Sequence, residues 1–328
     1  MRMVPIKPTT RNHRHGGLRK LFLDLKNQAY LQLFAVAGLA FMLVFSYIPM
    51  TGVIIAFKDY KATGGILGFF TSPWVGLKYY EEFFKDKAFW DLVKNTLTIS
   101  LLKMAFTFPM PILFAIALNE MRGQRIKRIV QTVSYLPHFI SWVVVYGIVF
   151  SFLNTQTGLA NQLLLALGLV KEPVQFLASP QWFYTLAVVT DVWKGMGWWA
   201  IIFLAAISGI SPELYEAAIV DGAGRLKRIW HITLPGIKGT VVVVLIMSIG
   251  NLLGGGLGGS NFEQSYFFGN AANYQRSEIL QTYTLKMGLA QGRFSYASAI
   301  GLLQSFISLA LILGSNRLAK KISGTGLF

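Results

Sequence analysis

The 328-residue chain has no cysteine, and its four histidines are scattered along the sequence. Without cysteine it cannot form a disulfide framework, a thiolate metal site or a thiol nucleophile. It also has no glycine-rich loop ending in Gly-Lys-Ser/Thr, the usual phosphate cradle of an ATPase, and no metal-binding His pair on a helix. These absences argue against an enzyme and against a metal or cofactor held by this chain.

Charged residues are scarce as well, at 13% of the chain, whereas hydrophobic residues make up 54% and the mean hydropathy is +0.51. An ordinary soluble domain of this length is less apolar, so the surplus is expected to face lipid. The net charge of +16 would suit a nucleic-acid partner. However, the cations lie between long uncharged stretches rather than over one soluble face, which argues against nucleic acid and indicates membrane topology.

A membrane-spanning helix needs about 20 consecutive apolar residues. Six segments meet this requirement and predict an all-α membrane protein: Tyr30 to Phe57, Asn95 to Leu118, Ile129 to Leu153, Phe183 to Ile210, Gly239 to Gly259 and Ser295 to Asn316. A further apolar stretch, Leu159 to Val170, is too short to span and is expected to form an interfacial helix.

The distribution of Lys and Arg orients these spans, because cytoplasmic loops carry the excess of both residues. With the N-terminus inside, the inner segments hold eighteen and the outer loops ten. Both termini are therefore expected in the cytoplasm. This gives a basic N-terminal segment over residues 1–29, a six-span domain over residues 30–316 and a short tail over residues 317–328.

The longest internal cytoplasmic loop in this topology covers Ser211 to Lys238. Ser211 is suited to cap a helix that begins at Pro212, and the glycines at 222 and 224 end that helix. A second short amphipathic piece then runs to Pro235. Two short helices joined by a glycine turn predict a compact knob that docks in a groove of another protein.

The loop has a specific pattern: Glu216-Ala217-Ala218, three residues, Gly222, nine residues, then Ile232-Thr233-Leu234-Pro235. With this spacing it resembles the EAA loop of binding-protein-dependent ABC importer permeases. That resemblance implies the six-span permease fold with cytoplasmic coupling helices, in a bacterial inner membrane. It also implies four kinds of partner: a second, different permease chain, two ATP-binding subunits that carry ATP and Mg, a soluble substrate-binding protein and membrane lipid.

The same resemblance assigns roles in coupling to the ATPase. Glu216 would be the acidic anchor, Ala217 and Ala218 would allow close approach, and Asp221 fits the family's common Asp-Gly-Ala. Gly222 would supply a turn that a Cβ atom would obstruct. Leu234 and Pro235 would end the element and lead back into the membrane.

Three further stretches, Asp191 to Trp199, Tyr283 to Leu289 and Phe294 to Gly301, are similar to permeases for oligosaccharides and polysaccharides. They imply a carbohydrate cargo, and an acidic, alginate-like polymer is the narrower form of this expectation. Two alternatives stay open. One is an ion-coupled secondary carrier, and the other is an ABC permease for amino acids or peptides.

Charged side chains at membrane depth are usually functional. Asp191 and Lys194 lie three residues apart on one helical face, so they either pair with each other or leave Lys194 free to attract the solute. Lys103 is expected to extend toward the membrane surface or to pair with the partner subunit. Trp142, Trp182 and Trp230 are interpreted as helix packing or as a membrane-interface belt.

Aromatic faces stack on sugar rings, so the predicted substrate path also contains Trp193, Trp198, Trp199, Tyr146 and Phe150, with helix packing as the alternative. The fifth span ends in a dense glycine run, Gly250 to Gly259, which predicts a broken or closely packed segment. Three uncharged hydrogen-bonding side chains near this run complete the predicted path: Asn251, Asn261 and Gln264.

Overall fold

The computed structural model describes residues 29–324 and 326, and these form two compact units, Met1–Ile54 and Ile55–Phe328. The basic segment predicted for residues 1–29 lies outside the described residues except for Ala29. The described chain is helical, and its extended pairing is a single antiparallel bridge between Lys58 and Trp74. The predicted all-α fold is confirmed.

The first unit is one apolar helical stretch. It contains α2 (Ala29–Met42), a π-helical turn η1 (Leu43–Tyr47) and α3 (Ile48–Met50), after which the 3-10 turn η2 (Thr51–Phe57) leads into the second unit. The stretch from Ala29 to Phe57 is long and apolar enough to cross a membrane, which agrees with the first predicted span.

The second unit continues through two groups of helices. The first group is η3 (Ala62–Gly64), α4 (Gly65–Thr71), α5 (Lys78–Lys85), α6 (Phe89–Thr107), α7 (Pro109–Glu120), α8 (Gln124–Tyr135), η4 (Leu136–Phe139), α9 (Trp142–Leu153), α10 (Leu159–Ala166) and α11 (Pro180–Ser208). The second group is α12 (Pro212–Val220), α13 (Arg225–Arg228), η5 (Ile229–Thr233), α14 (Leu234–Gly236), α15 (Lys238–Gly250), η6 (Leu252–Gly254), α16 (Asn261–Phe268), α17 (Tyr274–Ser277), α18 (Leu280–Leu285), η7 (Lys286–Ala290) and α19 (Phe294–Ser323).

Four helical stretches in the described chain are long and apolar enough to span a membrane: Ala29–Phe57, Phe89–Glu120, Pro180–Ser208 and Phe294–Lys321. Two bent pairs bring the count to six if each pair is one crossing. Gln124–Phe139 meets Trp142–Leu153 at 105°, and Arg225–Gly236 meets Lys238–Gly250 at 62°. The six predicted segments therefore all contain helix, but the third is bent within its length, and in the fifth α15 ends at Gly250 rather than at Gly259.

The bend in the third segment follows from its sequence. Pro137 lies in the 3-10 turn η4, and the next residues, Ile140 and Ser141, have extended backbone before α9 begins at Trp142. A proline removes one backbone donor, and here the α-helix tightens to a 3-10 turn at Pro137 before the two extended residues that make the bend. The residues before Pro137 form an amphipathic helix and those of α9 are almost entirely apolar, so the span predicted over 129–153 joined two different helices.

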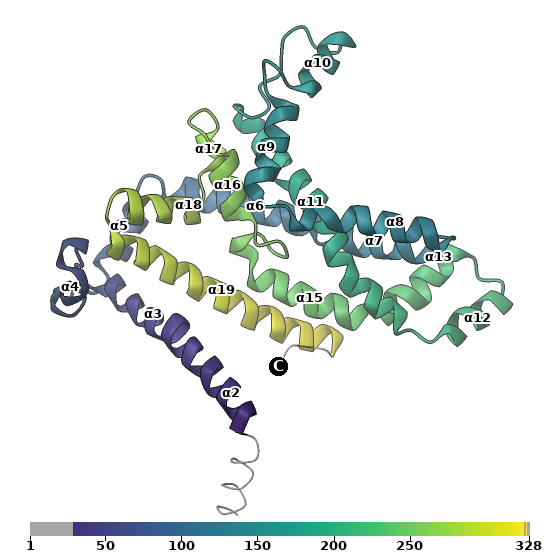
Figure 1. Cartoon of the computed structure of the whole chain (residues 1–328), viewed down its shortest axis with the longest axis horizontal. Coiled ribbons are helices and arrows are strands. Elements are labelled where there is room, and N and C mark those ends of the chain that lie inside the picture. The colour runs from purple at the N-terminus through teal and green to yellow at the C-terminus, as the bar shows by residue number, and fades with distance from the viewer. Residues whose placement is uncertain (1–28, 325, 327–328) are drawn as a thin grey trace, which may run out of the picture. The chain divides into compact units, whose positions relative to one another are not determined.

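The long helix α11 organises the second unit, because α6, α7, α8 and α15 all contact it. Its contact with α8 depends on Gly197, since a Cβ atom there would lie 2.1 Å from the Ser134 carbonyl oxygen. One apolar core lies between α7, α11 and α15, with Ala115, Ala200 and Phe203 fully buried. Figure 1 shows α15 and α19 side by side, while α9 and α10 extend away from α12 and α13.

Candidate functional site

The predicted coupling loop forms the expected pair of short helices. Ser211 occupies the N-cap position before Pro212, as predicted, although its side chain makes no capping hydrogen bond. α12 covers Pro212–Val220, and Tyr215 holds it to the second element through a 3.0 Å hydrogen bond between the Tyr215 and Thr233 hydroxyls. The two short helices are therefore fastened to each other as a knob (Figure 1).

Gly222 occupies the turn of this knob with a φ of +72°. L-residues with a side chain rarely adopt this left-handed conformation, whereas glycine does so without steric cost. Asp221 ends α12, and the next amides close the turn, because the Gly222 N–H donates to Ile219 and the Ala223 N–H donates to Ala218. The predicted need for glycine at 222 agrees with this geometry.

The second element of the knob runs one residue further than expected. Helical structure continues from Arg225 to Gly236, so Leu234 and Pro235 lie inside its last turn and the bend into α15 follows at Ile237. The turn η5, directly before Pro235, is a π-helix. Proline has no N–H for the carbonyl four residues earlier, and a wider turn is one way to accommodate that loss.

The knob exposes an apolar surface. Val220 is 88% exposed and Trp230 67%, and Leu214, Ile219 and Leu226 are exposed as well. Glu216 and Ala217 are exposed on the same short helix, and Ala218 is half-buried. Clustered exposed apolar side chains next to charged ones are typical of a protein-docking surface.

Lys103 is placed differently from the prediction. It is 1% exposed and lies inside the second unit, where its Nζ donates to Ser260 Oγ at 2.7 Å. Ser260 Oγ in turn donates to Asp191 Oδ1 at 2.5 Å, and Asp191 is 3% exposed. The expectation that Lys103 extends to the membrane surface or pairs with a partner subunit was wrong, because the lysine is satisfied internally by a serine and a carboxylate.

The glycine run closes around this buried charged group. α15 ends at Gly250, and the chain then passes through η6 and positive φ values at Gly255, Gly256 and Gly259. A Cβ atom on Gly258 would lie 2.9 Å from Asp191 Oδ1. The structure thus has the broken, closely packed segment that the glycine density predicts, with Asp191 as the group it packs against.

The three predicted amides near this run all have internal partners. Asn251 Nδ2 donates to the Gly256 carbonyl and holds the glycine loop. Asn261, fully buried, donates to Ser100 Oγ and to the Leu253 carbonyl. Gln264, also fully buried, donates to the Ala187 carbonyl and to Thr190 Oγ1. The structure gives Asn261 and Gln264 a helix-joining role, and their place in a substrate path stays a prediction.

Lys194 does not pair with Asp191, since the ion pairs found among the described residues do not include these two. Its Nζ donates to the His138 carbonyl at 2.6 Å and lies 5.6 Å from the centre of the Trp142 ring. The mutual pair was therefore the wrong alternative for this helix. Trp142, interpreted from sequence as packing, also supports the lysine through a cation–π contact.

The predicted stacking residues fall into separate environments. Trp198 stacks on His138 with ring centres 4.5 Å apart, and Trp199 packs against Gly195. Trp193 instead lines an apolar hollow of about 250 Å³ with Ile148 and Phe152 among its walls. Tyr146 and Phe150 line a different cavity, of about 410 Å³. The structure therefore does not bring all five aromatic residues into one site.

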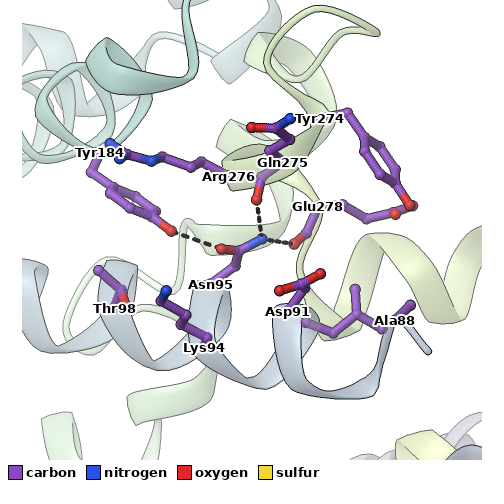
Figure 2. A pocket seen from close by; sticks show the side chains of 11 residues that line it. Ala88, Asp91, Lys94, Asn95, Thr98, Tyr184, Tyr274, Gln275, Arg276 and Glu278 are labelled. Carbon is purple, nitrogen blue, oxygen red and sulfur yellow. Dashed lines mark hydrogen bonds between the residues drawn. The ribbon is translucent and has the colours of Figure 1, made fainter. Parts of the chain in front are cut away.

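A polar cavity of about 550 Å³ lies at the N-terminal end of α6, and no sequence motif predicts it. Figure 2 shows Asn95 at its centre, donating to the Gln275 and Glu278 carbonyls and accepting a hydrogen bond from Tyr184. The hydrogen bond to Glu278, together with burial, raises the pKa of Tyr274 to about 12. These contacts join segments about 180 residues apart, which explains why no local motif predicts the cavity.

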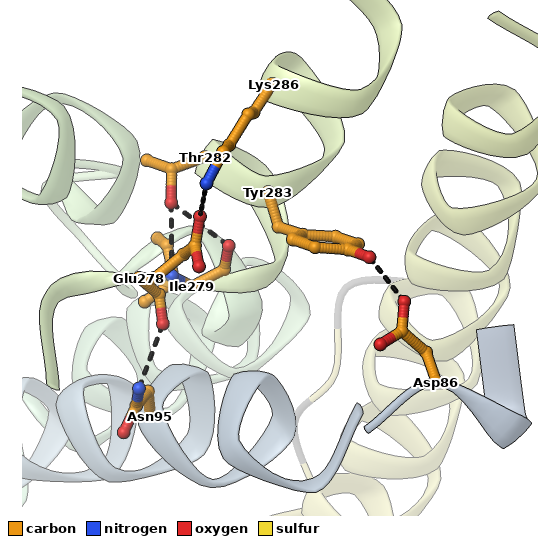
Figure 3. Close-up of polar contacts among 7 residues, drawn as sticks. All are labelled: Asp86, Asn95, Glu278, Ile279, Thr282, Tyr283 and Lys286. Carbon is orange, nitrogen blue, oxygen red and sulfur yellow. Dashed lines mark hydrogen bonds and ion pairs between the residues drawn. The ribbon is translucent and has the colours of Figure 1, made fainter. Parts of the chain in front are cut away.

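Next to this cavity, a carboxylate links two distant segments (Figure 3). Asp86 accepts hydrogen bonds from Tyr283 at 2.5 Å and from Tyr296 at 3.0 Å. Burial alone would raise the pKa of Asp86, but the bonds from Tyr283, the Ala88 N–H and Tyr296 outweigh it and lower that pKa below its ordinary value. Burial and the bond to Asp86 raise the pKa of Tyr283 to about 12. Figure 3 also shows the Lys286–Glu278 ion pair.

Comparison with known families identifies the class of protein that this fold and knob define. A family model for the binding-protein-dependent transport system inner membrane component matches residues 107–324. The chain belongs to this family. It is a multi-pass permease subunit of an ABC transporter, whose ATPase is a separate subunit, and permeases of this kind carry no cofactor. Family membership removes the ion-coupled carrier that the sequence left open.

Three individual proteins are similar over nearly the whole chain. The polygalacturonan/rhamnogalacturonan transport system permease protein YteP of Bacillus subtilis (strain 168) is 44% identical over 310 residues, 94% of each chain. A crystal structure of a bacterial ABC transporter that imports the acidic polysaccharide alginate matches with a TM-score of 0.83 and 36% identity, over 93% of this chain and 99% of that chain. A structure of a bacterial alginate ABC transporter in complex with a periplasmic protein bound to alginate pentasaccharide matches with a TM-score of 0.82 and 34% identity, over 94% of this chain and 100% of that chain.

Proposed function

We propose that the chain forms half of the translocation path for an acidic oligosaccharide, one built of uronate residues as alginate and polygalacturonan are. One observation carries this proposal. Relatives of two different kinds, each at least 34% identical over more than nine-tenths of this chain, are named for transport of carboxylate-bearing polysaccharides. A permease for a neutral oligosaccharide or for a non-sugar solute is the alternative that the test below distinguishes.

We infer the topology from the charge bias. Residues 1–29, the coupling loop 211–238 and the tail 317–328 are assigned to the cytoplasm, and residues 30–316 to the six-span domain. The assembly would contain a second permease chain, two ATP-binding subunits and a soluble binding protein. The binding protein fits the family description and the assembly in which one of the similar structures was solved.

In the proposed coupling step, the knob from Ser211 to Gly236 sits in a cleft of the ATPase. Glu216 pairs there with a basic residue, and Ala217 and Ala218 let the helix approach closely. ATP binding closes the ATPase pair and moves the knob, and the six-span domain switches from inward-facing to outward-facing to receive sugar. The exposed apolar surface at Leu214, Val220 and Trp230 supports this docking role.

In the proposed path, Lys194 attracts the carboxylates of the cargo. It is held in place by His138 and Trp142 rather than neutralised by an acid, so its charge stays available. Trp198, half-buried beside it on α11, offers a ring face to the sugar. Trp199 and Asn251 belong to the same proposal on the evidence of sequence alone, whereas Trp193 lines a separate apolar hollow and is not used in it.

The experiment that tests this function uses the complete transporter in proteoliposomes with its binding protein and ATP. Uptake of labelled oligogalacturonate or oligomannuronate is compared with uptake of neutral oligosaccharides of equal length. Faster uptake of the acidic series supports the proposal. Uptake restricted to neutral sugars, or to amino acids or peptides, would refute it.

A further inference from the structure

Three aromatic residues on α9 follow one another at intervals of four residues: Trp142, Tyr146 and Phe150. Residues four apart lie on nearly the same helical face, about 6 Å apart along the axis. Phe268 of α16 packs beside them, with its ring centre 6.4 Å from that of Trp142 and 5.7 Å from that of Tyr146. Tyr146 and Phe150 are 5.9 Å apart. We call Trp142, Tyr146 and Phe150, with Phe268, the aromatic row.

One end of the aromatic row lies under Lys194, whose ammonium is 5.6 Å from the Trp142 ring centre. An ammonium has three N–H donors, and the hydrogen bond to the His138 carbonyl uses one of them. The described residues form no ion pair with Lys194. A cation with free donors therefore marks this end of the row.

The other end of the row opens into a cavity of about 410 Å³ at the end of α9. No ionisable acid or base lines it apart from the Tyr146 hydroxyl; its walls are Tyr146, Phe150, Phe268, Asn154, Thr155, Gln156, Leu177, Ala178 and Asn270. Asn270 is occupied by the Leu177 and Phe268 carbonyls and only shapes the wall. The Tyr146 hydroxyl, the Thr155 hydroxyl and the Gln156 side-chain amide have no hydrogen-bond partner among the described residues, whereas the Gln156 backbone N–H donates to Asn154.

The opposite face of α9 provides a contrast within the same helix. There, Ile148 and Phe152 line the hollow of about 250 Å³ that also contains Trp193, and all the residues that line this hollow are apolar except Thr190. Such a surface suits lipid or another apolar helix. Only the Tyr146–Phe150 face combines ring faces with unpaired amide and hydroxyl groups.

We propose that the aromatic row and its cavity form a carbohydrate-binding track, along which successive sugar rings stack on Phe150, Tyr146 and Trp142 toward Lys194. A pyranose has an apolar C–H face and a rim of hydroxyls, and an aromatic floor with amides at its edge matches both. The unpaired Gln156 and Thr155 side chains form hydrogen bonds with the hydroxyls of the outermost sugar unit. This inference rests on the proposed function only in requiring an oligosaccharide cargo.

The track predicts a dependence on chain length. A disaccharide held at Lys194 does not extend two helical turns to Phe150, whereas a longer oligosaccharide does. Removal of the Phe150 ring should therefore weaken the binding of long cargo and leave short cargo unchanged. A loss of one stacking contact corresponds to about a tenfold higher Kd.

The test measures the Kd of labelled uronate oligosaccharides of two and five residues for the complete transporter in nanodiscs. Phe150→Leu keeps an apolar side chain of similar size and removes the ring. Phe152→Leu makes the same change on the other face of α9, at a side chain that is also exposed. We expect a higher Kd for the pentasaccharide with Phe150→Leu alone, wild-type Kd values with Phe152→Leu, and recovery with Phe150→Tyr.

Equal effects of the two leucine variants, or no effect of Phe150→Leu on the pentasaccharide, would overturn the track. If the transporter with Phe150→Leu does not assemble, Gln156→Ala tests the track instead, at an exposed loop side chain. Loss of its one hydrogen bond to the sugar should raise the Kd of the pentasaccharide about threefold. If the proposed function itself is wrong, the result differs from both of these outcomes, because the wild-type transporter then binds neither of the two uronate oligosaccharides. A wild type that binds both, with no effect of these variants, removes the track and leaves the function standing.

Discussion

Replacement of Lys103 by Met should destabilise the permease strongly, because the buried lysine shares one hydrogen-bonded network with the buried Asp191 carboxylate. Lys103 and Asp191 are 1% and 3% exposed and are joined through Ser260 by bonds of 2.7 and 2.5 Å. Lys103→Met removes one charge and leaves the Asp191 carboxylate buried without its cation. Breaking a buried pair in this way typically costs about 3–5 kcal/mol.

The double variant Lys103→Met/Asp191→Asn separates the lost pair from lost packing. With both charges gone, no unpaired ion stays buried, so the double variant should regain most of the stability that the single variant loses. Its stability change should differ from the sum of the single changes by at least about 1.5 kcal/mol, as expected for residues in one hydrogen-bonded network. Gly258, which packs against Asp191, is unchanged in every variant.

The assay is thermal unfolding of the complete transporter in detergent, followed by loss of the monodisperse size-exclusion peak. At about 2 °C for each kcal/mol, Lys103→Met should lower the midpoint by roughly 6–10 °C. Ser260→Ala, which removes the bridging hydroxyl but neither charge, should have a smaller effect. Equal midpoints for Lys103→Met and the double variant would refute the coupling of the two charges.

Three further predictions address coupling, cargo and pH. Gly222→Val should abolish ATP-driven uptake but leave membrane insertion intact, because the backbone φ at residue 222 is +72°. The control Gly224→Ala, at a residue with a φ of −66°, should transport normally. Uptake by Gly222→Val at the wild-type rate would remove the loop from the mechanism. Lys194→Met should weaken uptake of acidic oligosaccharides more than neutral ones, and equal losses for both would assign the lysine to structure alone. The pKa of Asp86 is lowered in the folded protein, so the Asp86 carboxylate stabilises the fold at pH values above its unfolded pKa of about 4, and this stabilisation is lost as the pH falls through the folded pKa. Asp86→Asn should therefore remove this part of the pH dependence of the unfolding midpoint. An unchanged pH dependence would contradict the prediction.

The membrane spans and the coupling knob were predictable because their signals are local. Hydropathy depends only on neighbouring residues, and the turn at Gly222 is set by the conformational freedom of one glycine. The bend at Ile140 was missed although Pro137 precedes it, because the predicted span joined the apolar residues of α9 with the more polar stretch before Pro137.

The polar contacts were not predictable, since they join residues far apart in the chain. Lys103 reaches Ser260 across 157 positions, and Asn95 reaches Glu278 across 183. Sequence spacing correctly placed Asp191 and Lys194 on one helix. It could not show that Lys103 and Ser260 approach Asp191 while a carbonyl from η4 approaches Lys194.

The proposed coupling has a continuous structural route through α11. This helix runs unbroken for 29 residues from Pro180 to Ser208, about 43 Å, and the chain enters α12 four residues later. Asp191, Lys194 and Trp198 all lie on it. Any displacement of the knob therefore acts directly on the helix that carries the buried charges and the lysine proposed to meet the cargo. At its other end the knob joins α15 through Ile237 alone, with a 62° bend, so a displacement of the knob acts on α15 as well as on α11.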